Sequence, residues 1–288
     1  MKKIYAYAFL SIFFWSTVST VAKLLLGARD NFQVLWISSL FAALFLLVIN
    51  IVTGNIKKLK AYKLKDYVIS VLIGIPGGFF YYLFYYAGTK KMLASQAFIV
   101  NYLWPIMSII MACILLKEKL TPRKIIAIVL SFIGVIIVMG NDILNFDADT
   151  AVGALFCALG AVCYGVFTAL NQKYYYNKRI SLMINYFVTF ALTSVINGVS
   201  GNLFIPTLPE ALGFAYNGMF SIAIANTLWM IALESGETAK ISNLAYMTPF
   251  ISLIWTSLVL KEPFRIELVI GLVVIVAGIF LQLKDKKK

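Results

Sequence analysis

The sequence contains no histidine and only 12 acidic residues in a chain of 288. Histidine is the commonest metal ligand and the usual proton carrier near neutral pH, so its absence argues against both roles. We expect no metal and no other cofactor. The cysteines Cys113, Cys157 and Cys163 lie inside apolar runs. A free thiol there behaves as a small apolar group, so no disulfide framework is predicted.

Charged residues of both signs are scarce, at 13% of the chain, whereas hydrophobic residues make up 61%. An ordinary soluble domain is about a quarter charged. The apolar residues fall in blocks of about 17–25, the length of a helix that crosses a bilayer. In lipid only helices and closed barrels satisfy their own backbone, and these blocks are too long for barrel strands. The sequence therefore predicts an all-α polytopic membrane protein, surrounded by lipid.

Ten transmembrane helices are expected, and an even number places both termini on one side. The predicted spans cover residues 4–26, 32–52, 67–87, 92–116, 124–140, 150–171, 181–200, 211–233, 240–260 and 266–283. Lys2 and Lys3 precede the first apolar run, and no small-residue cleavage site follows it. We therefore expect a retained first span rather than a removed signal peptide.

The net charge of +13 does not predict a nucleic-acid partner, because the basic residues lie in short loops between the apolar blocks. Most of them fall on the side that also holds the termini. Basic loops face the cytoplasm, so both termini are predicted to be cytoplasmic in a bacterial inner (plasma) membrane. The loop 141–149 carries Asp142, Asp147 and Asp149 and no basic residue. We expect it outside.

The two halves of the chain resemble each other at a single offset of 144 residues. At this offset Tyr102, Pro105, Ser108, Leu116, Lys117, Glu118 and Gly134 match Tyr246, Pro249, Ser252, Leu260, Lys261, Glu262 and Gly278. The organisation predicted is a first repeat (1–140), an external linker (141–149), a second repeat (150–283) and a basic tail (284–288). Each repeat has five spans, so the second must be inverted, as in secondary transporters with a site near the midplane.

These residues resemble the drug/metabolite transporter superfamily in its ten-helix form with two EamA-type repeats. The resemblance rests on Trp15-Ser16, Tyr164-Gly165, the paired prolines, the Lys-Glu after each, and the glycines of spans five and ten. The run Asn101-Tyr102-Leu103-Trp104-Pro105 is similar to the aromatic-amino-acid exporter branch. The resemblance implies export of small metabolites.

The candidate site centres on the prolines of spans four and nine. Pro105 and Pro249 have no N–H, so each frees a carbonyl four residues earlier, at Asn101 and Ala245. Such a carbonyl is tolerated at membrane depth where it meets protein or a wet cavity. The alternative is a kinked packing helix with small residues at its seam. Since Ala245 replaces Asn101 in the second half, we expect an asymmetric site.

The residues predicted to line a central cavity share polar or aromatic side chains within the predicted spans. They are Asn101, Tyr102, Trp104, Tyr246, Trp15, Ser16, Tyr164, Asn226 and Trp229, and Pro76 is expected to kink span three. For Tyr164, Asn226 and Trp229, packing within the bundle is an equal alternative.

Lys23 is the one basic residue placed inside a predicted span. An intramembrane charge is a functional candidate. The alternative, which its place near the outer end of the span favours, is that the ammonium reaches the lipid headgroups.

The function that fits these features is a secondary transporter that exports small metabolites, amino acids and aromatic ones among them. A multidrug or quaternary-cation exporter is the alternative, because aromatic faces attract cations. A membrane sensor or scaffold is a third class. An enzyme is not expected, because histidine, paired intramembrane acids and a Gly-rich phosphate loop are missing. The sequence has no ATP-binding motif of the Gly-x-x-x-x-Gly-Lys type, so we expect no ATPase subunit as a partner. The oligomeric state is not predicted.

No Asp or Glu lies in the middle of a predicted span. A proton crossing the protein needs a group that binds and releases it at working pH, and buried carboxylates or histidines usually serve. The sequence therefore predicts uniport, in which the substrate gradient alone drives the flux.

Overall fold

The computed structural model describes residues 2–140, 147–174, 177–234, 241 and 243–283. Within these ranges the chain forms helices and short loops and no strand. Among the described residues eight helices are long and apolar enough to cross a membrane, and two further ones, Ala245–Leu260 and Ile266–Leu281, are apolar but shorter. The protein is thus an all-α polytopic membrane protein. The count of ten spans stays a prediction.

Four of the eight long helices are interrupted near their middle, and the interruptions divide them into named pieces. They are α1 (Lys2–Ser16) with α2 (Val18–Leu26); α4 (Leu64–Gly74), η2 (Ile75–Phe80) and α5 (Tyr81–Lys91); α6 (Ala94–Asn101) with α7 (Trp104–Leu115); and α12 (Leu208–Ala215), η3 (Tyr216–Ile224) and α13 (Ala225–Leu233). The segments η2 and η3 are π-helical. Wide turns of this kind recur at functional sites.

The remaining long helices are continuous. They are α3 (Asn31–Val52), α8 (Pro122–Met139), α10 (Ala148–Lys173) and α11 (Lys178–Val199). A short 3-10 helix, η1 (Asn55–Ala61), follows α3, and a 3-10 turn, η4 (Ala245–Met247), leads into α15 (Thr248–Leu260), which precedes α16 (Ile266–Leu283). The first residue predicted for span nine, at position 240, lies outside the described residues, as do positions 141–146 of the linker and the basic tail.

The three predicted kinks coincide with changes in the helical backbone. Pro105 and Pro249 each occupy the second position of a helix, α7 and α15. The first N–H groups of a helix have no intrahelical partner, so a proline there costs no backbone hydrogen bond. Between α6 and α7 the α-helix is broken at Tyr102 and Leu103. Pro76 lies in the π-helical segment η2.

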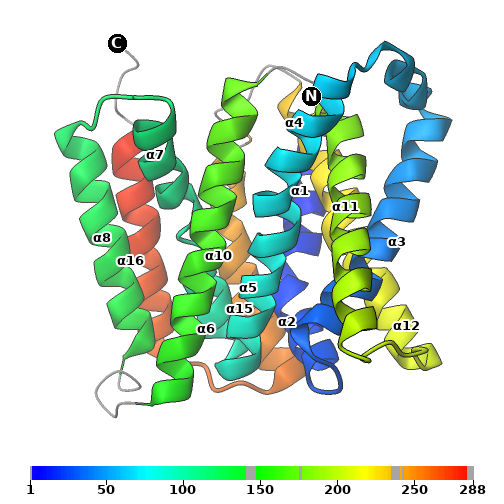
Figure 1. The fold of residues 1–288 in the computed structure, drawn as a ribbon. Coiled ribbons are helices and arrows are strands. Elements are labelled where there is room, and N and C mark those ends of the chain that lie inside the picture. The colour runs from blue at the N-terminus through cyan, green and yellow to red at the C-terminus, as the bar shows by residue number, and fades with distance from the viewer. Residues whose placement is uncertain (1, 141–146, 175–176, 235–240, 242, 284–288) are drawn as a thin grey trace.

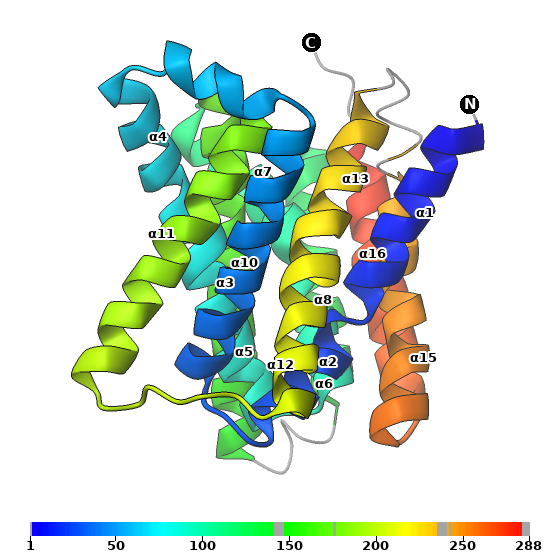
Figure 2. The same ribbon diagram turned by 90° about the vertical axis from the view of Figure 1, so that its right-hand side faces the viewer.

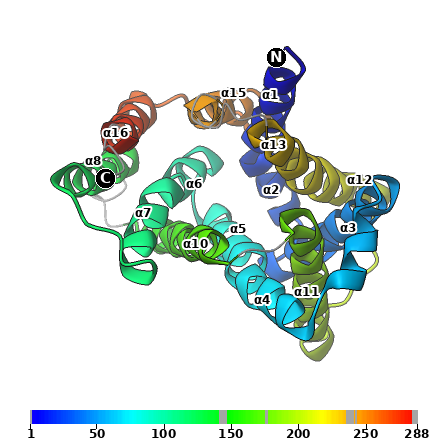
Figure 3. The same cartoon turned by 90° about the horizontal axis from the view of Figure 1, so that it is seen from above.

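The helices form two bundles and two flanking pairs around a central region (Figures 1–3). In the first bundle α10 packs against η2, α5, α6 and α7; in the second, α1 packs against η3, α13 and α15, and α2 packs against α15. The pair α3–α11 and the pair α8–α16 stand on opposite sides, as the view from above shows (Figure 3). The helices α1 and α16 begin and end, respectively, on the same face, here called the terminal face; the other is the distal face (Figure 1).

Glycines allow the helices to approach closely at matched positions of the two halves. A Cβ added to Gly74 would lie 2.2 Å from the Asn185 side chain on α11, and one added to Gly218 would lie 2.2 Å from the Ser38 carbonyl on α3. Small residues give such contacts in membranes because dispersion forces must replace the hydrophobic effect between helices. Gly218 faces backbone, which cannot rotate away as a side chain can.

We expect Gly218→Ala to lower the free energy of unfolding by about 1–3 kcal/mol, the usual cost of overpacking a filled interior. Gly198 is the matched control, because a Cβ there meets nothing within 4 Å. The measurement is thermal unfolding of each purified variant in one detergent. A Gly218→Ala protein as stable as the Gly198→Ala control would show that η3 and α3 do not touch as closely as described.

Candidate functional site

A cavity lies between the two bundles, and its empty space is about 1070 Å³ when the open solvent at its mouth is included. Its walls come from α1, α2, η2, α5, α6, α10, α11 and α13, and from the two helix breaks near Tyr102 and Ala245 with the first residues of α7 and α15. Several lining residues lie close to the terminal-face ends of their helices, such as Leu182 near the start of α11 and Trp229 near the end of α13. The cavity therefore occupies the middle and the terminal-face half of the protein.

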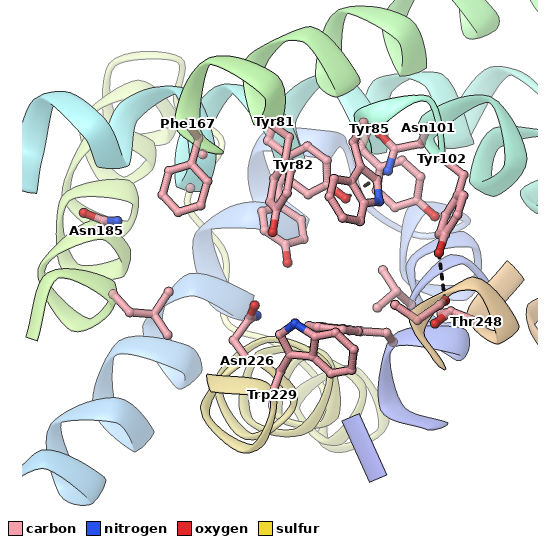
Figure 4. Close-up of a pocket in the computed structure, with 18 of the residues that line it drawn as sticks. Tyr81, Tyr82, Tyr85, Asn101, Tyr102, Phe167, Asn185, Asn226, Trp229 and Thr248 are labelled. Atoms are coloured by element: carbon pink, nitrogen blue, oxygen red, sulfur yellow. Dashed lines mark hydrogen bonds between the residues drawn. The ribbon is translucent and has the colours of Figure 1, made fainter. Parts of the chain in front are cut away.

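Aromatic rings form two facing walls of this cavity (Figure 4). On the second bundle Trp15 and Trp229 contact each other with ring centroids 5.1 Å apart. On the first bundle the ring of Tyr164 contacts Tyr81 at 4.9 Å and Trp104 at 5.2 Å. Contacts at these distances hold each ring in place. Two fixed aromatic surfaces thus face a common space from opposite bundles.

The polar groups of the cavity wall are all neutral. No charged side chain occurs among the lining residues in the described part of the chain. Asn101 donates from Nδ2 to the Tyr81 hydroxyl at 2.9 Å, and Asn226 donates to the Ile222 carbonyl at 2.7 Å. The Asn101 Oδ1, the Tyr85 hydroxyl and the Thr248 hydroxyl are buried without a partner among the described atoms. Unpaired buried polar atoms are costly, and a bound ligand is one way to satisfy them.

The carbonyl that Pro249 leaves free is satisfied across the bundles. The Tyr102 hydroxyl donates to the Ala245 carbonyl at 2.7 Å, so the break between α6 and α7 is bonded to the start of the α15 segment (Figure 4). The sequence predicts a free carbonyl at Ala245 that meets protein or a cavity, and the structure provides the protein donor. This bond fixes the relative height of the two broken helices.

The structure brings most of the predicted site residues into the cavity wall. Trp15, Asn101, Tyr102, Trp104, Tyr164, Asn226 and Trp229 all line it. Ser16 is fully buried beside the wall and donates to the Phe13 carbonyl at 2.7 Å. The Tyr246 ring packs on Phe280 of α16, with centroids 4.9 Å apart, and is not among the lining residues. A role in binding stays a prediction for the whole set.

Several lining residues are absent from the predicted set. They are Val18, Gly77, Gly78, Tyr81, Tyr82, Tyr85, Phe98, Phe167, Leu182, Asn185, Tyr186, Ala245 and Thr248. For the tyrosines of span three the sequence favours an aromatic belt at the membrane surface, with one or two of them facing the cavity as the alternative. In the structure three of them, Tyr81, Tyr82 and Tyr85, follow the π-helical turn η2 and line the cavity.

At the distal face, side chains of one bundle are bonded to the other. Lys23 of α2 donates to the carbonyls of Thr89 and Met92, at 2.7 and 2.6 Å. The Asn217 amide of η3 donates to the Tyr86 hydroxyl of α5 at 2.8 Å. The Lys23 ammonium therefore binds protein carbonyls, where the preferred interpretation of the sequence directs it to lipid headgroups. The bundles are joined distally and separated by the cavity on the terminal side.

Comparisons with known proteins agree with this architecture. A model of the EamA-like transporter family matches residues 2–140 and again residues 151–283. An uncharacterized transporter of Clostridium kluyveri is 26% identical, over all of this chain and 95% of the relative. The aromatic amino acid exporter YddG of Ancylobacter novellus is 25% identical over 62% of this chain and 63% of its own length. A solved crystal structure superposes with a TM-score of 0.68 at 21% identity, over 99% of both chains, which shows a shared fold.

We expect Tyr102→Phe to lower the free energy of unfolding by about 1–3 kcal/mol, because the Ala245 carbonyl would stay buried without its donor. Tyr246→Phe is the control, since it removes a hydroxyl at the matched position of the other half, outside the cavity wall. Thermal unfolding of both variants in one detergent makes the comparison. Equal stability of the two would contradict a bond that joins the broken helices.

Proposed function

Because the chain belongs to the EamA-like transporter family, we propose that it exports amino acids, aromatic ones among them, by alternating access. At the coarser level it is a multi-pass membrane protein that exports a small molecule and is not an enzyme. The observation that carries the finer proposal is the cavity itself, neutral and walled by facing aromatic rings.

The chemistry of the cavity wall suits a zwitterion that carries an aromatic ring. The ring of such a substrate gains contact area between Trp15 and Trp229 on one side and Trp104 and Tyr164 on the other. Its carboxylate needs donors, which amide and tyrosine hydroxyl groups provide. Its ammonium needs acceptors, which the amide and hydroxyl oxygens of the lining residues provide. A substrate with no net charge also costs less to desolvate in a neutral cavity than an ion does.

A quaternary or other lipophilic cation is the second candidate, and the same rings favour it. A cation over the face of a tryptophan gains about 0.5–2 kcal/mol, more when water is excluded. Such a ligand has no acceptor, so it could not accept a hydrogen bond from the amides of Asn101 and Asn226 or from the tyrosine hydroxyls. We therefore place it second to the amino acid.

The mechanism proposed is a rocking of the two bundles about the cavity. The two family matches and the repeated sequence support two five-span repeats of opposite orientation, an arrangement in which one half rocks against the other. The distal bonds of Lys23 and Asn217 support a state that is closed at the distal face. The basic loops predict that both termini are cytoplasmic. In this state the cavity would then be accessible from the cytoplasm, where an exporter binds its substrate.

We propose uniport as the coupling. The lining residues of the described chain include no carboxylate, and Glu118, Glu234 and Glu262 lie at helix ends. Among the described lining residues a proton would find no carboxylate or histidine to carry it through the cavity. The membrane potential still acts on any substrate with net charge, at about 2.3 kcal/mol per charge per 100 mV.

The test is efflux from proteoliposomes preloaded with labelled tryptophan, leucine or tetraphenylphosphonium, with an ionophore present to remove any pH difference. We expect tryptophan to leave faster than from empty liposomes, and faster than the other two solutes. Trp104→Ala should raise the KM for tryptophan about 2- to 10-fold, the worth of one aromatic contact. Trp255→Ala is the matched control, because Trp255 lies on α15 away from the cavity wall.

Each outcome has a separate meaning. Selective flux of tetraphenylphosphonium would contradict the amino acid as the substrate and favour the lipophilic cation. Tryptophan efflux that stops when the ionophore is added would contradict uniport but not the choice of substrate. An equal loss of tryptophan flux in Trp104→Ala and Trp255→Ala would contradict the assignment of the cavity as the binding site.

A further inference from the structure

The helices α7 and α15 end in the same unusual way, at the repeated Leu-Lys-Glu. Lys117 and Lys261 are the non-glycine residues with positive φ in the described chain, at 57° and 55°. The N–H of the following glutamate then bonds back to the sixth residue before it, Glu118 to Ala112 and Glu262 to Thr256. This left-handed turn is a common helix end, but glycine is its usual residue. A lysine is strained in the left-handed backbone conformation because its Cβ approaches the following carbonyl. The turn reverses the chain, so the glutamate that follows points back toward the helix bundle.

Glu262 uses this turn to reach the amino end of α6 in the other bundle. Its Oε1 accepts from the Ala94 N–H at 2.7 Å, and its Oε2 accepts from the Ser95 N–H at 3.0 Å and the Ser95 hydroxyl at 2.6 Å. A carboxylate at a helix amino end satisfies free N–H groups and meets the positive end of the helix dipole. The cap is unusual because it comes from a residue 168 positions away.

Lys23 makes the complementary contact at the carboxyl end of α5, the helix just before α6. Its ammonium donates to the Thr89 and Met92 carbonyls at 2.7 and 2.6 Å. A cation at the end of a helix meets the negative end of its dipole. The second bundle therefore holds the α5–α6 turn with a cation at the carboxyl end of one helix and an anion at the amino end of the next.

We propose that Lys23 and Glu262 form a two-charge latch that closes the distal face by gripping the α5–α6 turn. Both charges come from the second bundle, and both sets of backbone partners belong to the first, so the latch must break when the bundles part distally. The cavity lies on the terminal side of it. This inference rests on the proposed alternating access, and it assigns the latch as the contact that sets how long the distal gate stays shut.

Glu118 is the natural control, because it follows the same turn at the other end of the protein. In this state its carboxylate pairs with Lys124, six residues along the chain and at 3.0 Å, and that pair lies on the terminal side. Loss of the Glu118 charge therefore breaks no bond between the bundles that the structure describes. Glu262→Gln and Glu118→Gln make the same chemical change at matched positions.

The experiment measures access to the cavity from each face without any substrate. The three native cysteines are replaced (Cys113→Ser, Cys157→Ala, Cys163→Ser), and Val18→Cys places one thiol in the cavity wall. A membrane-impermeant maleimide is added to right-side-out and to inverted vesicles. A protease-sensitive tag after Lys288 shows which vesicles expose the terminal face. The parent should react from the terminal face and be protected from the distal face.

Glu262→Gln and Lys23→Met should each raise the rate of distal labelling about tenfold, since bonds to a charged group are lost. Glu118→Gln should leave it unchanged. Unchanged distal labelling in both latch variants would overturn the proposal, as would an equal rise in Glu118→Gln, which would indicate general loosening. Glu262→Gln keeps the shape of the side chain and decides the matter alone if Lys23→Met does not accumulate. Because labelling needs no substrate, a failed efflux assay and a failed latch are distinguishable.

Discussion

The rest of the structure depends on the rule that backbone polar groups within a membrane must find partners inside the protein. An unbroken helix satisfies this rule alone, but it offers nothing to a solute. Here helices are interrupted beside the cavity, and an interruption can leave a backbone group that needs a new partner. The Tyr102 hydroxyl on the Ala245 carbonyl is the clearest case, because the donor and the acceptor belong to different bundles. The carbonyl that the helix break frees is therefore also the acceptor of a hydrogen bond that joins the two bundles.

The same rule explains where the charges lie. The cavity wall in the described chain is neutral, whereas Lys23 and Glu262 bind backbone groups exposed at helix ends on the distal face. Several backbone groups hydrogen-bonded to a charge replace the water that would otherwise solvate it. The charge loses these hydrogen bonds when the contact breaks. A neutral cavity with charged contacts at its closed end separates binding of the solute from control of the gate.

The sequence predicts the helical class, the positions of the spans and the breaks at Pro105 and Pro249, because run length and the missing proline N–H are local properties. It does not predict η3, because the segment Tyr216–Ile224 contains no proline that would mark the π-helical turn. The place of Tyr81 in the cavity wall is not predicted either, because Pro76 indicates a kink but not the π turn that rotates the residues after it. The match of Tyr246 to Tyr102 predicts a place in the cavity wall, but Tyr246 lies in the 3-10 turn η4 and its ring packs on Phe280. The partners of Lys23 are backbone carbonyls more than sixty residues away, and no side chain in the sequence marks them.

The central claim is that two bundles move as units and part at the distal face. It is tested most directly by the distance between two spin labels, one on the distal end of each bundle. One label replaces Lys90, next to the last residue of α5, and the other replaces Phe264, in the loop after α15. Both positions are exposed, so labels there disturb no packing. In reconstituted protein we expect one main distance without substrate and a second, longer distance whose population changes when tryptophan is added. A single distance that stays the same with and without substrate would contradict the account.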